Sequence, residues 1–238
     1  MLIDKKKAEP LKSLTVLHIA PTPFFSDRGC HIRIKGIINA LKKKGVRSIL
    51  CAYHLGRDIP HIETVRTPRL PGFTKKEPGP SPFKYPADIL LFFKVFSVIH
   101  KKRPHIIHAH LHEGALIGWA ARAFFFWRKI PLVFDMQGSL TGELESHGYF
   151  DGFKPLKKVF RTIEYLIARM PDYFVCSSQR GVDILRSNFR VNPNRIFLAY
   201  DGYDIERADP AALNEMKNKM NLPSGTPIVI YTGLLMKA

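Results

Sequence analysis

The sequence contains few cysteines. Its 238 residues include three, Cys30, Cys51 and Cys176. An odd number without paired spacing excludes a disulfide framework and a cysteine-based zinc site, and it favours a reducing compartment. A segment able to cross a bilayer is missing too, since that requires roughly 20 consecutive apolar residues. The longest apolar runs, 87–99 and 115–127, are shorter, and each contains a charged residue.

The N-terminal segment also lacks an apolar core. Residues 1–12 contain four lysines but no hydrophobic stretch of the kind that a secretory signal requires. We therefore expect a cytoplasmic protein, with peripheral docking on the inner face of the cell membrane as an open alternative.

Acidic residues are scarce: 20 aspartates and glutamates stand against 37 lysines and arginines, for a formal net charge of +17. Such an excess of positive charge is typical of proteins that bind nucleic acid, an anionic membrane or phosphorylated substrates. A basic surface that only faces solvent has the same composition. The sequence contains no zinc-finger spacing, no aromatic RNA-binding segment and no heptad zipper. We therefore rank an anionic membrane surface above nucleic acid, which we do not expect as a partner.

Apolar residues are plentiful in short runs. They make up 45% of the chain and include 17 phenylalanines, which is enough for a sizeable core and argues against disorder. Eight runs rich in valine, isoleucine and leucine are continuous rather than alternating, as in parallel strands covered on both faces. The expected strands are Thr15–Ala20, Ser48–Tyr53, Ile62–Thr67, Ile106–Ala109, Leu132–Met136, Tyr173–Ser177, Ile196–Ala199 and Ile228–Thr232.

Helical patterns lie between most of these strands. In the first of them, Ile34, Ile37, Ile38 and Leu41 recur at helical spacing and define one apolar face. Arg33, Lys35, Asn39 and Lys42 lie off this face. Alternating strands and helices predict an α/β fold with a Rossmann-like, doubly wound and mostly parallel sheet.

Two irregular segments interrupt this order. Residues 68–86 hold six prolines and indicate an exposed loop or lid, and residues 137–155 hold four glycines. Residues 209–223 have the pattern of a helix followed by a linker, after which the last expected strand begins. We therefore expect two domains: residues 1–222, and residues 223–238 as the first strand of a second domain that this chain leaves incomplete.

Six segments resemble, in order, the motifs of the GT-B glycosyltransferases of the large retaining family 4, also called group 1. They are the loop around Gly29, "RPHIIHAHLHE" with the following "GALIGWAAR", "IPLVFDMQGSL", "DYFVCSSQ", "RIFLAYDGYD" and "IVIYTGLL". Each is unspecific by itself, but together they extend over nearly the whole chain. The resemblance is to the N-terminal, acceptor-side domain of such an enzyme, truncated at the start of its C-terminal donor-binding domain.

The resemblance implies transfer of a sugar from a nucleotide sugar to a glycan or lipid-linked acceptor, with retention, in cell-envelope synthesis. It implies no metal and no cofactor, because the leaving diphosphate itself accepts the proton while positive groups stabilise its charge. In relatives those groups belong to the C-terminal domain. Here Leu234 follows Gly233 where relatives carry an arginine, so we expect little or no activity from this chain alone.

Candidate site residues follow from the same motifs. Gly29 would let the backbone approach a diphosphate or the acceptor at a helix N-terminus, although a glycine that only makes the turn is the alternative. Gln137 stands where many relatives carry a histidine near the reacting carbon, and glutamine can hydrogen-bond a sugar hydroxyl but cannot be protonated. We assign Gln137 and Asp135 to the catalytic site, Asp135 without a defined role. To substrate binding we assign Arg28, Gly29, His110, Glu113, Gly138 and Gly233, with a plain first-turn helix role as the equal alternative for Glu113.

Three histidines, His108, His110 and His112, lie two residues apart and could share one face of a strand. No cysteine or aspartate joins them to complete a set of metal ligands. We therefore expect core or strand-end histidines and no metal site.

Two other functions stay open at the level of the sequence. One is a non-catalytic basic module that docks on an anionic membrane or on a lipid-linked acceptor. The helix expected over 85–102 favours it, because Phe92, Phe93 and Phe96 lie beside lysines as in a peripheral amphipathic helix. A core helix with a basic end has the same composition and is the more frequent case. The other is a fragment of a sugar-nucleotide epimerase of the same two-domain fold.

Overall fold

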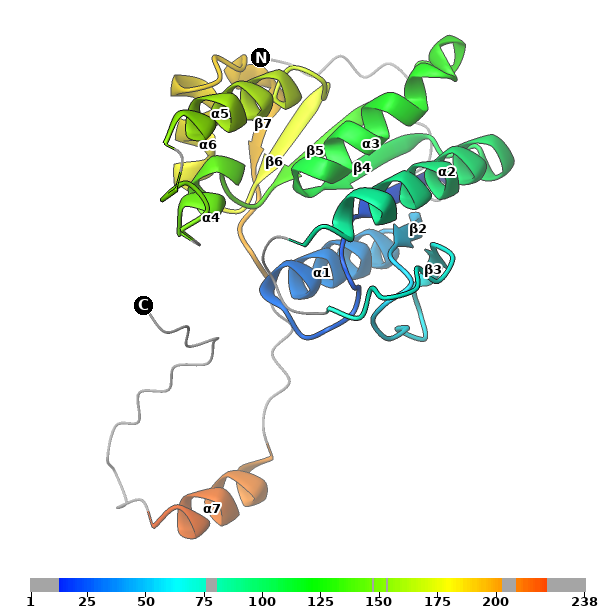
Figure 1. Ribbon diagram of the computed structural model, residues 1–238. Helices are drawn as coiled ribbons and strands as arrows, with labels where there is room; N and C mark the ends of the chain where they lie inside the picture. Colours follow the sequence, from blue (N-terminus) through cyan, green and yellow to red (C-terminus); the bar gives the residue numbers. More distant parts are fainter. Residues whose placement is uncertain (1–12, 76–80, 147, 153, 203–208, 222–238) are drawn as a thin grey trace. The chain divides into compact units, whose positions relative to one another are not determined.

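The computed structural model describes residues 13–75, 81–146, 148–152, 154–202 and 209–221 (Figure 1). The chain divides into two compact units, residues 1–202 and 203–238. In the second unit the structure describes helix α7, Pro210–Lys219, whose first turn is capped by the Asp209 carboxylate. The domain boundary expected at residue 222 and the strand expected over 228–232 lie outside the described residues.

The first unit contains one sheet of seven parallel strands in the order β3-β2-β1-β4-β5-β6-β7. This confirms the predicted Rossmann-like α/β fold. The observed bounds agree with the expected ones for β1 and β5 and differ by a single residue at one or both ends for the other five. The strands are β1 Thr15–Ala20, β2 Arg47–Ala52, β3 Glu63–Arg66, β4 Ile106–His110, β5 Leu132–Met136, β6 Tyr173–Cys176 and β7 Ile196–Leu198.

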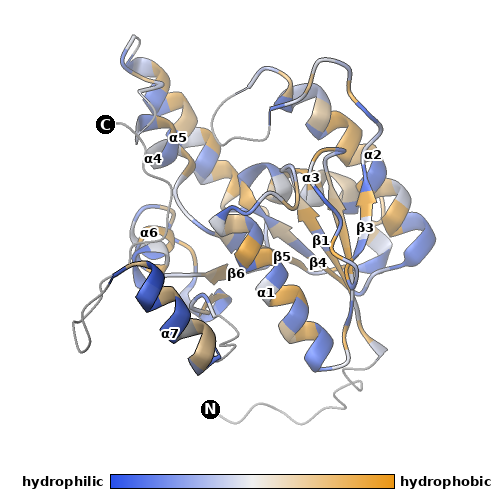
Figure 2. Ribbon diagram, turned by 90° about the horizontal axis from the view of Figure 1, so that it is seen from below, coloured by the Kyte–Doolittle hydropathy of each residue, from blue (hydrophilic) through white to orange (hydrophobic). Residues whose placement is uncertain are grey.

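Helices cover the two faces of this sheet unequally. Side chains alternate between the faces along a strand, so Leu17 and Ile19 pack with one set of helices while Ala20 faces the other way. The first set contains α2 Lys84–Lys102, α3 Leu111–Ala123, α5 Pro155–Ile167 and α6 Gln179–Ser187, and the opposite face is covered by α1 Gly29–Lys43 (Figure 1). Coloured by hydropathy, the strands are largely hydrophobic and α1 is mixed (Figure 2). Within the described residues no helix combines the length and apolarity that a bilayer crossing requires.

The chain reverses its direction of travel across the sheet at β1. This strand has β2 on one side and β4 on the other, with His18 opposite His108. In open α/β sheets ligands bind at such a reversal, outside the carboxyl ends of the strands. The fold therefore points to the segments that follow β1 and β4.

Two expectations about local structure need correction, and one residue off the predicted apolar face is buried. That residue is Arg33, whose side chain reaches a buried carboxylate. The glycine-rich segment 137–155 contains a short helix, α4 Leu140–Ser146, whose start is held by hydrogen bonds described below. The proline-rich segment is not wholly exposed, since Phe73 is buried against the rings of Tyr53 and Phe83.

Candidate functional site

The candidate residues gather at the carboxyl edge of the sheet. Arg28 and Gly29 lie between β1 and α1, at the start of that helix. His110 ends β4, and Glu113 follows in the first turn of α3. Asp135 lies in β5, and Gln137 and Gly138 follow between β5 and α4. Gly233 lies outside the described residues.

Asp135 is the centre of this edge. Arg33 donates to both carboxylate oxygens, from Nε at 2.9 and 3.2 Å and from Nη2 at 2.7 Å. His110 Nδ1 and Gln137 Nε2 each lie 2.9 Å from Oδ2. Because a carboxylate accepts, both of these nitrogens carry the hydrogen. Asp135 thus orients three side chains that come from α1, β4 and the segment after β5.

The surroundings of Asp135 keep it ionised. Complete burial alone would raise its pKa, but the hydrogen bonds from His110 and Arg33 outweigh burial and hold the pKa well below its ordinary value. All of its acceptor positions face protein donors, so the geometry favours a positioning role over proton transfer. This gives Asp135 the role that the sequence left undefined.

The same contact fixes the orientation of the Gln137 side chain. Its amide nitrogen is turned toward Asp135, and its carbonyl oxygen has no partner among the described residues. A half-buried carbonyl with a fixed direction is suited to accept a hydrogen bond from a hydroxyl group. The geometry therefore fits the sugar-contacting role expected for Gln137.

Arg33 also ties the end of the sheet to this site. Its Nη1 donates to the Ala199 carbonyl at 3.0 Å and to the Asp201 carboxylate at 2.5 Å. Asp201 is 64% exposed, whereas the Arg33 side chain is 5% exposed. One arginine thus joins a buried carboxylate to the segment that leaves β7 toward the second unit.

The loop after β1 is held by His31, which sequence reasoning missed. The Ser26 backbone N–H donates to His31 Nδ1 at 2.9 Å, so the hydrogen is on Nε2, which lies 2.7 Å from Thr22 Oγ1. Burial, with Arg28 nearby, lowers the pKa of His31 to about 4, so the ring is neutral at pH 7. A buried neutral imidazole therefore fixes the loop that leads to Gly29.

A second loop packs against the first. Gly56 has φ +100°, and a Cβ there would lie 2.2 Å from the Phe24 carbonyl oxygen. Only glycine allows that approach. Paired backbone hydrogen bonds between Phe25 and Arg57, at 3.1 and 3.2 Å, fix the two loops together.

Gly29 and Gly138 differ from Gly56 in this respect. A Cβ at either position meets nothing within 4 Å, and neither glycine has a positive φ. Neither residue is therefore required by its own backbone conformation. The space beside each glycine is open, at what we call the rim of the site. Arg28, which precedes Gly29, donates to Thr22 Oγ1 at 3.3 Å.

Glu113 occupies the first turn of α3, and its carboxylate meets Lys84 at the start of α2 at 2.5 Å. Burial would raise the pKa of Glu113, but the Lys84 ammonium outweighs burial and lowers it. Behind this pair Asp88 accepts a hydrogen bond from the Tyr53 hydroxyl at 2.5 Å. Burial, reinforced by Glu113, raises the pKa of Asp88 to about 7. Asp88 therefore differs from Glu113 and Asp135, whose pKa values are lowered, and the sequence did not reveal this difference.

The segment after Gln137 is anchored by Glu164 of α5. This buried carboxylate accepts from the backbone N–H groups of Leu140 and Thr141 at 2.9 and 3.2 Å, and from the Thr141 hydroxyl at 2.7 Å. His112 Nε2 approaches it at 3.4 Å. Burial would raise the pKa of Glu164, but these donors lower it to about 2. An acidic side chain from another helix thereby holds the start of α4 and, with it, the position of Gln137.

The histidines of the "HAHLH" run do not share one environment. His112 belongs to α3 and pairs with Glu164, whereas His108 and His110 lie in β4 beside His18 of β1. His18 Nδ1 is 3.1 Å from His110 Nε2. The three histidines therefore do not share one strand face, because β4 ends at His110.

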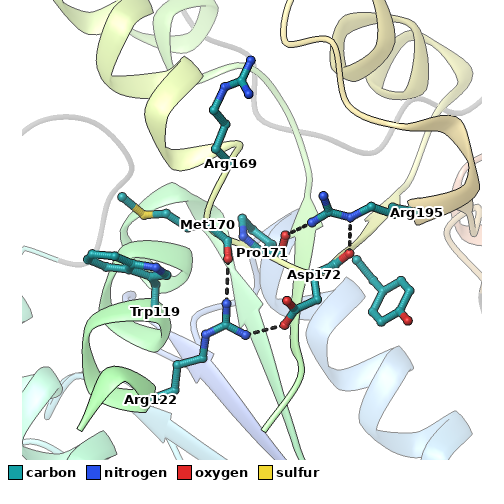
Figure 3. A pocket seen from close by; sticks show the side chains of 8 residues that line it. Trp119, Arg122, Arg169, Met170, Pro171, Asp172 and Arg195 are labelled. Atoms are coloured by element: carbon teal, nitrogen blue, oxygen red, sulfur yellow. Dashed lines mark hydrogen bonds and ion pairs between the residues drawn. The ribbon is translucent and has the colours of Figure 1, made fainter. Parts of the chain in front are cut away.

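A hollow at the opposite end of the sheet does not belong to this site. It has a volume of about 540 Å³ and opens around the starts of β6 and β7 (Figure 3). Arg122 is bonded to Asp172 and donates to the Met170 carbonyl at 2.8 Å, and Arg195 donates to the Asp172 carbonyl at 2.5 Å. The guanidinium groups of Arg122 and Arg195 are thus occupied by hydrogen bonds that join the segments around the hollow. We therefore assign these two arginines a structural role.

Comparison with known proteins places this geometry in context. A family model described as Glycosyltransferase Family 4 matches residues 28–207. No curated protein sequence matches the chain. Sucrose-phosphate synthase from Thermosynechococcus elongatus superposes with a TM-score of 0.68 at 15% identity, over 90% of this chain and 54% of that one. A glycosyltransferase from Rickettsia africae ESF-5 superposes with a TM-score of 0.55 at 15% identity, over 90% and 51%.

These two structures share the fold of residues 13–202, and this chain spans about half of their length. A UDP-N-acetylglucosamine 2-epimerase from Rickettsia bellii is more distant, with a TM-score of 0.49 at 15% identity over 89% of this chain and 49% of that one.

Proposed function

Because the chain belongs to glycosyltransferase family 4, we propose that residues 13–202 form the acceptor-side part of a retaining glycosyltransferase. The donor is a nucleotide sugar and the acceptor a lipid-linked glycan at an anionic membrane, in cell-envelope synthesis. The observation that carries the proposal is the half-buried Gln137 side chain, whose amide nitrogen donates to Asp135 at the carboxyl edge of the sheet, beside the open space at Gly138.

The arrangement supports chemistry without a protein base. Of the two carboxylates expected in the site, Glu113 is paired with Lys84, and Asp135 is enclosed by Arg33, His110 and Gln137. Neither is placed to take a proton from an acceptor. This agrees with a transfer in which the leaving diphosphate accepts that proton and the protein orients the sugar.

The membrane part of the proposal rests on an aromatic surface at the far end of α2 and α3. We define it by four exposed residues, Phe93, Phe124, Phe126 and Trp127, which are 59–76% exposed. The rings of Phe92, Phe96 and Phe125 lie between them and connect the exposed rings through successive ring contacts of 5.0–6.1 Å. Exposed apolar patches of this kind mark sites of interaction.

Basic residues end both segments that carry the aromatic surface, although Lys102 also lies 3.4 Å from Glu63. Lys101, Lys102 and Arg103 end α2, and Lys129 follows the exposed rings; all four are exposed. Arg103 lies close enough to Arg128 to add to burial in lowering its pKa. Apolar side chains flanked by lysine and arginine are the composition of a surface that binds anionic lipid.

The aromatic surface is connected to the site along one side of α2. Tyr85, Ile89 and Phe93 recur every four residues and are all exposed. This stripe begins next to Lys84, the partner of Glu113, and ends at the aromatic surface. A membrane that meets the stripe would present a lipid-linked acceptor to the rim of the site.

A labelled-sugar assay tests the proposal. Membranes are incubated with the gene product that contains these residues and with radiolabelled nucleotide sugars, and label is counted in the lipid extract. We expect label in the lipid fraction, and less of it with Gln137→Ala. Label that enters only water-soluble products would overturn the lipid-linked acceptor, and no transfer with any nucleotide sugar would overturn the enzyme.

A further inference from the structure

Three imidazoles meet inside the sheet, on the face that α1 covers. His18, His108 and His110 each present a ring nitrogen within 4.8 Å of the others, and all three residues are buried. Their ring centroids are 4.7–5.4 Å apart. The grouping arises because His18 pairs with His108 across β1 and β4, and His110 follows two residues later on the same face.

Two of the rings are oriented by second contacts. His110 donates from Nδ1 to Asp135 at 2.9 Å, which leaves the lone pair of its Nε2 facing His18 Nδ1 at 3.1 Å. The other nitrogen of His18, Nε2, lies 3.3 Å from Ser48 Oγ. Histidine ligands of metal ions almost always hold their second nitrogen in this way, on a carboxylate or another polar group. The 3.1 Å separation is close to the roughly 3.3 Å between two nitrogens of a tetrahedral zinc site with 2.0–2.1 Å bonds.

The third ring is the unexplained one. His108 Nε2 is buried and has no hydrogen-bond partner among the described residues. A hydrogen-bonded chain from Ser48 through His18 and His110 to Asp135 satisfies the other rings but leaves this nitrogen out. Burying a polar atom without a partner is unfavourable by about 1–3 kcal/mol. A metal ion bound through this nitrogen would remove that penalty.

We propose that His18, His108 and His110 bind one zinc ion, with a water molecule in the fourth position. Neutral imidazole nitrogens suit zinc, and three histidines with one open position form a known zinc coordination set. His108 retains 8% exposure and pairs with the half-buried Val133 of β5. The site departs from the expectation of no metal, which considered His108, His110 and His112 and could not include a residue of β1.

Binding needs no external proton acceptor. The hydrogen on His18 Nδ1 moves to Nε2, so that Nδ1 offers its lone pair to the ion and Nε2–H donates to Ser48 Oγ. His110 keeps its hydrogen on Nδ1 for Asp135 and binds through Nε2. The ion would therefore cross-link β1 and β4 directly behind Asp135, without occupying the rim of the site.

Titration of the metal-free chain with Co²⁺ tests the site, with Zn²⁺ as competitor. We expect one equivalent to give the visible absorption of tetrahedral cobalt, which Zn²⁺ abolishes, and Zn²⁺ to raise the melting temperature. His108→Leu, which leaves the hydrogen-bonded chain intact, should weaken binding more than a hundredfold. Ser48→Ala should weaken it about tenfold, and His61→Ala, at an exposed histidine, should not change it.

Two results would overturn the proposal. One is a wild-type chain that shows no tetrahedral cobalt spectrum, in which case the rings form a hydrogen-bonded chain only. The other is unchanged cobalt affinity in His108→Leu with an intact circular dichroism spectrum. His108→Gln, which keeps a polar side chain, replaces the leucine variant should that one unfold. Because the readouts are spectral and thermal, they decide the metal site independently of any transferase activity.

Discussion

Arg33 and Asp135 are 102 residues apart in the sequence, yet the guanidinium of one holds both carboxylate oxygens of the other at 2.7–3.2 Å. Both side chains are almost completely buried. An ion pair in such a place is not by itself evidence of high stability, but breaking it leaves an uncompensated buried charge. The pair also sets the direction of Gln137 through Asp135, so its integrity bears on the site.

Arg33→Met should lower the free energy of unfolding by about 3–5 kcal/mol, because it leaves Asp135 buried without its cation. Urea unfolding followed by circular dichroism measures the change. Arg47→Met is the matched control, since Arg47 pairs with Glu63 at 2.8 Å but both side chains are exposed. That control should change stability by about 1 kcal/mol or less. Equal losses in the two variants would contradict the buried-pair argument.

Glu164 should make stability depend on acid pH. Its pKa is lowered in the folded chain to about 2, from an ordinary value of 4.5. A lowered pKa contributes stability above the unfolded value, and that contribution is lost as the pH falls from about 4.5 toward 2. Glu164→Gln should therefore unfold more easily at pH 7, by up to about 3 kcal/mol, and show a flatter loss of stability in that window. Chemical unfolding at several pH values measures both effects.

The control for Glu164→Gln is Glu145→Gln, at an exposed residue of α4 that pairs with Lys157. It should leave the pH profile unchanged. Asp135 also has a lowered pKa, so some acid sensitivity should persist in Glu164→Gln. A wild-type chain whose stability is constant between pH 5 and 2 would contradict the role given to Glu164.

Gly29→Val should leave the melting temperature nearly unchanged and lower sugar transfer severely. The position has open space and no positive φ, so the side chain meets no protein atom and instead fills the rim. Gly114→Ala is the contrasting variant, because its Cβ would lie 3.0 Å from the Ile19 carbonyl oxygen. It should lower the melting temperature. If Gly29→Val unfolds the chain, Gly29 is a turn residue and the rim is elsewhere.

Gln137→Ala should lower transfer about five- to tenfold, the loss of one hydrogen bond, and Gln137→His should keep or raise the rate. Gln137→Glu has nearly the same shape but places a second carboxylate against Asp135. It should therefore impair transfer more than alanine does, and the loss should lessen at acid pH as one carboxylate is protonated. Rates measured beside melting temperatures distinguish these cases. Equal activity of all three variants would remove Gln137 from the site.

Anionic vesicles should bind the chain and release it when salt is added. Each basic residue near an anionic surface contributes about 1 kcal/mol, and that attraction is screened over about 8 Å at physiological ionic strength. Trp127→Ser should weaken co-sedimentation about tenfold, since burying an aromatic side chain contributes about 1.5–3 kcal/mol. Tyr200→Ser, at an exposed aromatic residue outside the aromatic surface, is the control. Equal binding to neutral and anionic vesicles would contradict the proposal.

The strands were predictable because their information is local. Continuous apolar runs placed β1 and β5 at their observed residues, and helical spacing placed the end of α2 at Lys102. The family resemblance then predicted that the candidate residues lie at one edge of the sheet. The family match over residues 28–207 confirms that the chain belongs to this family.

The interactions between those residues were not predictable in the same way. Periodicity assigns a charged residue such as Arg33 to solvent, because its buried partner belongs to a strand far along the chain. His18, His31 and Glu164 were missed for a related reason: each takes its role from a contact that only the folded sheet creates. Pairing of polar groups over long distances has no local pattern.

The parallel sheet has a consequence for the order of folding. Parallel neighbours cannot be joined by a tight turn, and β1 meets β4 only when segments ninety residues apart come together. Such non-local pairings make folding slow. The contact of Arg33 with Asp135 requires that closure and the addition of β5, so we expect it to form late in folding. Weakening this contact should therefore raise the unfolding rate more than it lowers the folding rate.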